Sequence, residues 1–143
     1  MTMNDDVREE LDLCSQLYDR LTVELAEKDL SDARRRSLIL ALRSTVRLRE
    51  KSVQDAESFG LMPPAEAAEL RVEFARAALA VCEEQRAAVF GRVHAPEQSV
   101  GERCSPAHTY CILRAMTRRL EMEHDRAVAH QTARRKQRFV EVS

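Results

Sequence analysis

Residues 105–138 read SPAHTYCILRAMTRRLEMEHDRAVAHQTARRKQR, and this segment determines how the rest of the chain is interpreted. Apolar residues recur in it at steps of three and four, which places them on one face of a long helix. The members of this stripe are Tyr110, Leu113, Met116 and Leu120. Beyond Leu120 the stripe thins to Ala127 and Val128, and the chain turns basic. A helix that stops offering an apolar face is expected to leave its bundle and meet solvent or a partner.

The same periodicity predicts three further helices upstream, so we expect an all-α protein. A composition with only three Gly, four Pro and 4% aromatic residues offers little material for strands and turns. The predicted helices cover about residues 5–28, 32–59, 64–90 and 106–138, with a loop over residues 92–104. Their short connections favour a single domain, residues 1–143, folded as an antiparallel four-helix bundle with an extended C-terminal helix.

Helix boundaries are predicted from capping residues. Ser31 and Ser105 precede helical patterns and are the expected N-caps, the second followed by Pro106 in the first turn. Gly60 is expected to end the second helix in the left-handed conformation, and Gly91 is expected to end the third. These signals give the bundle its predicted connections.

The first predicted helix carries a seam of apolar residues at alternating steps of four and three, as in helices packed against other helices. The seam consists of Val7, Leu11, Cys14, Tyr18, Leu21 and Leu25. Leu13 and Leu17 widen it, so we expect this helix to contact two neighbours. In the second helix, Arg49 stands where an apolar residue is expected.

Charge is divided by helix. Residues 1–30 carry nine acidic and three basic side chains, whereas residues 31–60 carry four and seven. Residues 61–104 carry seven acidic and five basic side chains, and residues 105–143 carry four and eight. In an antiparallel bundle this pattern predicts that acidic helices pair with basic neighbours, at up to about 1 kcal/mol for each exposed pair.

Several classes of protein are not expected from the sequence. The acidic start MTMNDDVREE contains no apolar run, so it is predicted to be neither a signal peptide nor a transit peptide. No run of about eighteen apolar residues predicts a membrane span. The four widely spaced cysteines favour reduced thiols and a cytoplasmic location.

One group of cysteine and histidine residues has a spacing that metal ligands can have. Cys104, His108 and Cys111 could place three zinc ligands at a helix start, with His94 or Cys82 as the fourth. The alternative is that Cys82 and Cys111 are small buried residues and that His108 is exposed. Because no second cysteine pair completes the pattern, we predict no metal site.

Two catalytic patterns are equally incomplete. Glu121 and His124 form one Glu-x-x-His motif, whereas di-iron bundles need two such motifs and two further Glu ligands. Cys104 beside Arg103 could act as a nucleophile, with His108 or His94 as its base, but no oxyanion-hole segment accompanies it. We therefore predict a non-enzymatic protein that needs no cofactor.

The favoured hypothesis is an interaction protein, an adaptor, inhibitor or small structural subunit, that binds a protein partner through its helix faces. The last helix is predicted to outrun the others, at about 1.5 Å per residue, by roughly two turns. The predicted partner-binding residues on this overhang are Arg134, Arg135, Lys136, Arg138, Phe139 and Val140. The interaction-protein hypothesis includes a second copy of the chain as a partner.

The alternative hypothesis is a small subunit of a nucleoprotein assembly. Arginine suits bidentate contacts to phosphate, and it outnumbers lysine in this chain. The arginines predicted to contact the nucleic-acid backbone are Arg34, Arg35, Arg36, Arg43, Arg47, Arg114, Arg118 and Arg119. Few aromatic residues are available for base stacking, which favours the protein-partner hypothesis.

Overall fold

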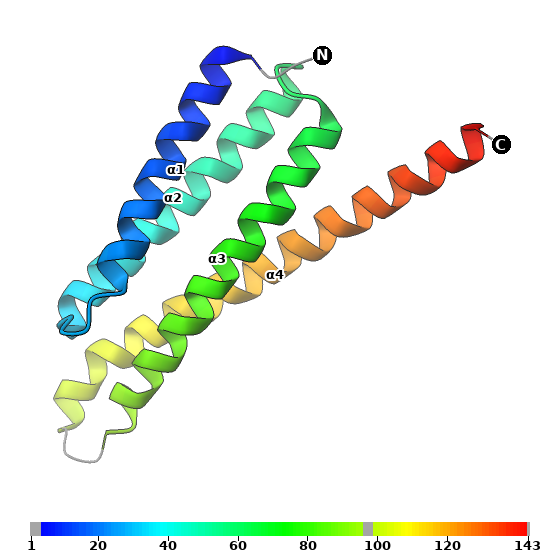
Figure 1. Ribbon diagram of the computed structural model, residues 1–143. Coiled ribbons are helices and arrows are strands. Elements are labelled where there is room, and N and C mark those ends of the chain that lie inside the picture. Colours follow the sequence, from blue (N-terminus) through cyan, green and yellow to red (C-terminus); the bar gives the residue numbers. More distant parts are fainter. Residues whose placement is uncertain (1–3, 96–98, 143) are drawn as a thin grey trace.

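The computed structural model describes residues 4–95 and 99–142, with side chains described as far as Val140 (Figure 1). Within these residues the chain forms four α-helices and no strand, which confirms the predicted all-α antiparallel bundle. The helices are α1 (Asp5–Leu25), α2 (Asp32–Ser58), α3 (Pro64–Val93) and α4 (Val100–Val142). Figure 1 shows the last turns of α4 running away from the other three helices.

Capping groups explain the first two connections. Ser31, the predicted N-cap of α2, accepts a hydrogen bond at Oγ from the backbone N–H of Arg34 at 3.1 Å. Asn4 caps α1 in the same way, accepting from the N–H of Asp6 at 2.9 Å. After α2, Gly60 has a φ of 71°, in the left-handed region that glycine adopts without a Cβ penalty.

The connection between α3 and α4 is shorter than the predicted loop over residues 92–104. Gly91 does not end α3, because the helix continues through it to Val93. Glycine permits the left-handed conformation but does not require it, and Gly91 keeps a helical backbone here. The prediction that α3 stops at residue 90 is therefore wrong by about one turn.

α4 likewise begins earlier than predicted, at Val100 rather than Pro106. Ser99 is the serine that caps it, accepting at Oγ from the N–H of Glu102 at 3.2 Å. Ser105 and Pro106 lie inside the helix, where the proline nitrogen cannot donate to the Glu102 carbonyl. Both Ser99 and Ser105 are suitable N-caps in the sequence. The choice of Ser105, which precedes the proline, gave the wrong start for α4.

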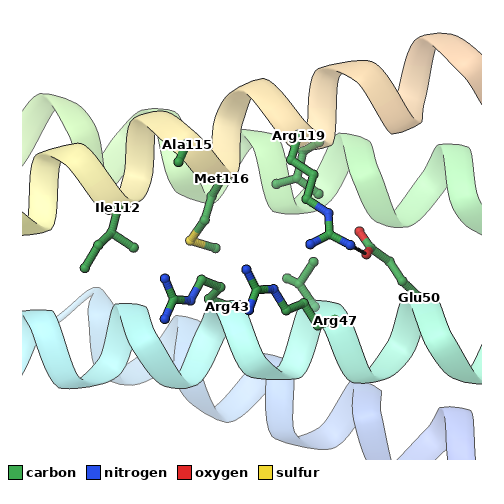
Figure 2. A pocket seen from close by; sticks show the side chains of 9 residues that line it. Arg43, Arg47, Glu50, Ile112, Ala115, Met116 and Arg119 are labelled. Carbon is green, nitrogen blue, oxygen red and sulfur yellow. Dashed lines mark hydrogen bonds and ion pairs between the residues drawn. The ribbon is translucent and has the colours of Figure 1, made fainter.

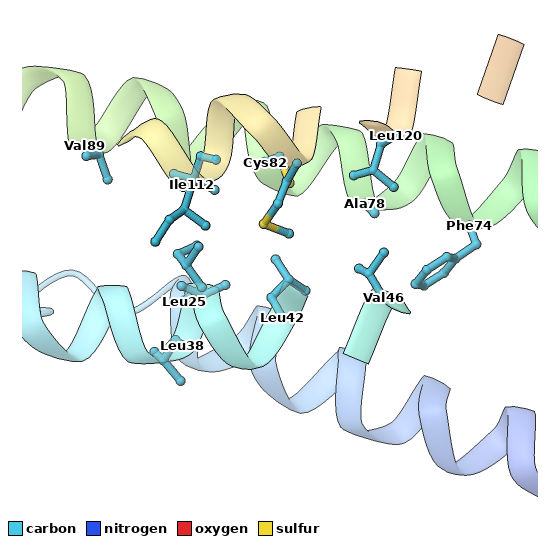
Figure 3. Packing of buried hydrophobic residues seen from close by; sticks show 13 residues of the cluster. Leu25, Leu38, Leu42, Val46, Phe74, Ala78, Cys82, Val89, Ile112 and Leu120 are labelled. Atoms are coloured by element: carbon cyan, nitrogen blue, oxygen red, sulfur yellow. The ribbon is translucent and has the colours of Figure 1, made fainter. Parts of the chain in front are cut away.

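The main core lies between α2, α3 and α4, and Leu25 of α1 packs against it (Figure 3). Leu42 of α2 and Leu113 of α4 are fully buried at its centre. α3 contributes the small side chains of Ala78 and Cys82, also fully buried, so its backbone can approach α4 closely. A second cluster joins α1 to the α2–α3 turn and consists of Val7, Leu11, Val53, Ala56, Met62 and Ala67.

Arg49 is half-buried between α1 and α3, at the position where the stripe of α2 predicted an apolar side chain. Its guanidinium lies over the ring of Phe74 at 4.1 Å, and one of its terminal nitrogens is 3.5 Å from Ser15 Oγ. The buried Nε of Arg49 donates no hydrogen bond within the described residues. Burial lowers the pKa of Arg49. Phe74 also packs edge-on against Tyr18, with ring centroids 5.4 Å apart.

α1 lies at the edge of the bundle and packs mainly against α2. It ends at Leu25 rather than near residue 28. Leu13 and Leu17, which widen the apolar stripe in sequence, are 56% and 42% exposed. No described helix covers this face. α1 does reach a second neighbour, α3, but through Tyr18, whose ring packs against Phe74.

Four ion pairs join different helices within residues 4–95 and 99–142, and α2 takes part in each. Only the pair of Arg34 with Glu24 of α1, at 3.4 Å, follows the predicted pairing of basic α2 with an acidic helix. In the other three pairs α2 supplies the carboxylate: Asp32 to Arg92, Glu50 to Arg119 and Glu57 to Arg71. The predicted complementarity is therefore largely reversed, because α2 contributes its carboxylates to three of these four pairs and an arginine to one.

α4 is 43 residues long, but charged side chains recur along its whole length. No helix in the described part of the chain combines length with the apolar character that crossing a bilayer requires. The length of α4 instead carries its C-terminal end past the core, whose last buried member on this helix is Ala127.

Candidate functional site

The edge between α2 and α4 contains an open groove of about 180 Å³. Its floor is apolar and includes Val46 of α2 with Ile112 and Met116 of α4. Arg43 and Arg47 lie one turn apart on α2 and extend across the gap toward α4 (Figure 2). We call this the α2–α4 groove; it combines an apolar floor with a cationic rim.

Glu50 and Arg119 form an ion pair at one end of the α2–α4 groove. Arg119 donates from Nη2 to Glu50 Oε2 at 2.9 Å. Burial raises the pKa of Glu50, while Arg119 and, more weakly, Arg47 act in the opposite direction and Glu123 adds to the rise. This pair is neutral as a unit, so the charge that the groove offers comes from Arg43 and Arg47. Neither has a hydrogen bond or ion pair within the described residues.

The groove continues toward the start of α3 as two further cavities of about 370 and 330 Å³. Both signs of charge line the first, including Lys51, Asp55 and Arg71. The second includes Arg126 and His130 of α4. This mixture of charges suits the polar surface of a protein better than a uniformly anionic strand.

Arg134 lies beside α3 instead of projecting from the bundle. Its side chain is half-buried and, with Arg135 and Arg138, lines a cavity of about 210 Å³ against Ala65 and Ala68. One Nη of Arg134 is buried and makes no hydrogen bond within the described residues. The predicted overhang therefore begins later along α4 than the sequence suggested.

The remaining predicted partner-binding residues are exposed at the end of α4. Arg135 and Lys136 are exposed, and Phe139 and Val140 follow with 76% and 73% of their surface accessible. Arg135 and Arg138 border the start of α3, and beyond them the helix runs away from the other three in Figure 1, so its end presents a basic and apolar surface. We call residues 135–140 the C-terminal end of α4.

The predicted phosphate-contacting arginines separate into different environments. Three of the eight line the α2–α4 groove: Arg43, Arg47 and Arg119. Arg34 and Arg35 are engaged within the molecule: exposed Arg34 pairs with a carboxylate of α1, and half-buried Arg35 donates to an amide oxygen of α3. Arg36 is half-buried on α2, whereas Arg114 and Arg118 are exposed on α4. The structure therefore brings three of these arginines together but does not gather all eight on one surface.

The predicted thiol and metal candidates lie along α4. Cys104, His108 and Cys111 are all exposed, and Cys104 Sγ lies 3.4 Å from the carbonyl oxygen of Val100. Cys82 is fully buried, and burial raises its pKa to about 11. Among the residues that the structure describes, no group of three or more His, Cys, Asp or Glu side chains could hold a metal ion.

The two remaining histidine candidates have local contacts. His124 Nδ1 lies 3.3 Å from Asp125 Oδ1, while Glu121 is exposed. His94 is the C-cap of α3, and its ring packs against that of Phe90 with centroids 4.3 Å apart. Both histidines are engaged within their own helix.

Sequence reasoning found the arginines of the groove but missed its floor and its carboxylate. Glu50 follows Arg43 by seven residues and Arg47 by three, which places all three on one side of a helix. That spacing was the available signal. No comparable sequence signal identified the apolar floor, because Ile112 and Met116 cannot be distinguished from other core residues before α4 is placed beside α2.

Geometry is the basis for a functional assignment, because the chain matches no protein-family model, no curated protein and no solved structure.

Proposed function

We propose that this chain is a non-enzymatic helical-bundle interaction protein that binds a macromolecular partner, with the C-terminal end of α4 as its main contact. The observation that supports this proposal is the exposure of Phe139 and Val140 where α4 leaves the bundle. Exposed apolar side chains rimmed by charges are typical of helix faces that dock on another protein. Arg135 and Lys136 provide that rim.

The test is a truncation that removes residues 135–143 and keeps Arg134, the half-buried arginine against α3; Arg135 and Arg138 of the same cavity are exposed. The melting temperature should stay nearly unchanged, because the buried residues of α4 end at Ala127. Affinity capture from the native host, quantified by mass spectrometry, should lose the partner that the full chain retains. A truncated chain that unfolds would instead make this segment part of the core.

Two matched variants separate charge from apolar contact at this surface. One replaces Arg135, Lys136 and Arg138 by Gln, and the other replaces Phe139 and Val140 by Ala. A salt-sensitive loss of capture in the first alone indicates an acidic partner surface. A loss in the second alone indicates apolar docking. Sedimentation of the purified chain tells whether the captured partner is a second copy.

A second candidate function is that of a subunit in a nucleoprotein assembly. It is supported by the position of Arg43 and Arg47 beside Arg119, without hydrogen bonds or ion pairs of their own within the described residues. If the chain binds the nucleic-acid backbone, the logarithm of the association constant should fall linearly with the logarithm of the salt concentration. Replacing both arginines by Gln should lower the magnitude of that slope by about two. The candidate ranks second because the groove floor is apolar, which phosphate groups do not favour.

A further inference from the structure

The α2–α4 groove offers a binding surface that the C-terminal end of α4 does not include. Ile112 and Met116 on its floor lie four residues apart, and so do Arg43 and Arg47 on its rim. Four residues of helix rise by about 6 Å. The groove therefore repeats its apolar and cationic features at the same spacing along two neighbouring helices.

Charge complementarity defines what such a surface accepts. Two guanidinium groups that form no hydrogen bond or ion pair within the described residues, about one turn apart, match two carboxylates placed one turn apart on another helix. The apolar floor matches two apolar side chains on the adjoining face of the same helix. Ala115, exposed on the α4 side, leaves room for the backbone of such a helix to approach.

We propose that the α2–α4 groove binds an acidic amphipathic helix of a partner protein. This inference rests on the proposed role as an interaction protein but assigns a second surface and the chemistry of its ligand. A nucleic-acid strand fits the groove less well, because its phosphates would meet Val46, Ile112 and Met116 instead of donors. The arginines would pair with the carboxylates of the bound helix while its apolar side chains cover the floor.

The probe is a synthetic fluorescein-labelled helix of about five turns, with Leu at two positions four apart and Glu at two positions four apart on the adjoining face. Its control has Lys in place of Glu. Fluorescence anisotropy should show binding of the acidic helix to the full chain and none of the basic helix. Absence of binding by the acidic helix would overturn the proposal.

Charge-reversal variants locate the contact. Arg43→Glu with Arg47→Glu should weaken binding of the acidic helix about tenfold or more, whereas Arg20→Glu with Arg76→Glu, an equal charge change at exposed positions outside the groove lining, should weaken it less than about threefold. Ala115→Glu should weaken it without changing the melting temperature, because the new side chain occupies the groove at an exposed position. Equal effects of both double variants would overturn the proposal, since long-range charge alone would then explain binding.

Two further measurements distinguish other occupants and other surfaces. The chain that lacks residues 135–143 should bind the acidic helix within about twofold, even if its capture of the host partner is lost. A large loss there would place the probe on the C-terminal end of α4 and overturn the groove assignment. Tighter binding of a labelled oligonucleotide that depends on Arg43 and Arg47 would overturn it in favour of nucleic acid. Self-association abolished by the same double variant would overturn it in favour of a second copy.

Discussion

At the scale of single residues, Tyr18 provides a pH-dependent test of the core. Burial raises the pKa of Tyr18 to about 12, and nearby Cys82 adds to the rise. An unfolded tyrosine ionises near pH 10, so the stability that Tyr18 contributes is present below about pH 10 and is lost as pH rises toward 12. In a Tyr110→Phe variant, absorbance at 295 nm should show the remaining tyrosine titrating near pH 12. The same variant in urea should titrate near pH 10, and a titration near 10 without urea would show that Tyr18 is solvated.

Arg49 tests whether a half-buried cation stabilises the bundle. Its guanidinium gains a ring contact with Phe74, about 0.5 to 2 kcal/mol in comparable cases, but loses hydration. We expect Arg49→Met to change the free energy of unfolding by less than about 1 kcal/mol, because the thioether chain fills the same space. Arg49→Ala should cost about 1 to 2 kcal/mol, because the packing of the stem is lost. Urea denaturation measures both, and equal losses would show that the charge itself is stabilising.

At the scale of the helix, the start of α4 can be tested with two serines. Ser99→Ala removes the capping oxygen that accepts from Glu102 and should destabilise the protein by about 1 kcal/mol. Ser105→Ala should be neutral or slightly stabilising, because its buried Oγ makes no hydrogen bond within the described residues. Denaturant midpoints compare the two variants directly. A larger loss in Ser105→Ala would restore the predicted boundary at Pro106.

The four helices were predictable from the sequence because apolar periodicity and helix caps depend on residues that lie close together in the chain. Ser31 and Gly60 each had one clear role, and the structure confirms both. The prediction that Ser105 is an N-cap was wrong because a second serine lies six residues earlier and a proline can be accommodated within the helix. The predicted packing of Leu13 was wrong for a different reason. A stripe shows which residues are able to be buried, but the number of neighbouring helices decides whether they are.

At the scale of the whole molecule, the candidate site was only partly predictable. The arginines on α2 were visible in sequence, but their availability depends on which carboxylates reach them across the bundle. Glu50, Glu57 and Asp32 of α2 form their ion pairs with arginines of α3 and α4, so none of them forms an ion pair with Arg43 or Arg47. Such choices among long-range pairs are made by the packing of complete helices.

The edge position of α1 predicts uneven stability across the molecule. α1 packs mainly on α2 and leaves Leu13 and Leu17 exposed, whereas α3 and α4 bury their faces against each other. Local opening is cheapest where few apolar contacts are lost, so amides of α1 should exchange with deuterium faster than those near Ala78 and Leu113. Hydrogen-exchange mass spectrometry at neutral pH measures this difference. Equal protection of both regions would show that α1 opens only with global unfolding.

α4 also fixes a distance. Arg119 at the groove and Phe139 near its end are separated by twenty residues of one continuous helix, which corresponds to about 30 Å. A partner that contacts both surfaces meets them on a rigid spacer, and its second contact forms at a high effective concentration once the first is made. That partner must itself reach across about 30 Å, so a short peptide reproduces one contact only and will bind more weakly than the protein from which it is derived.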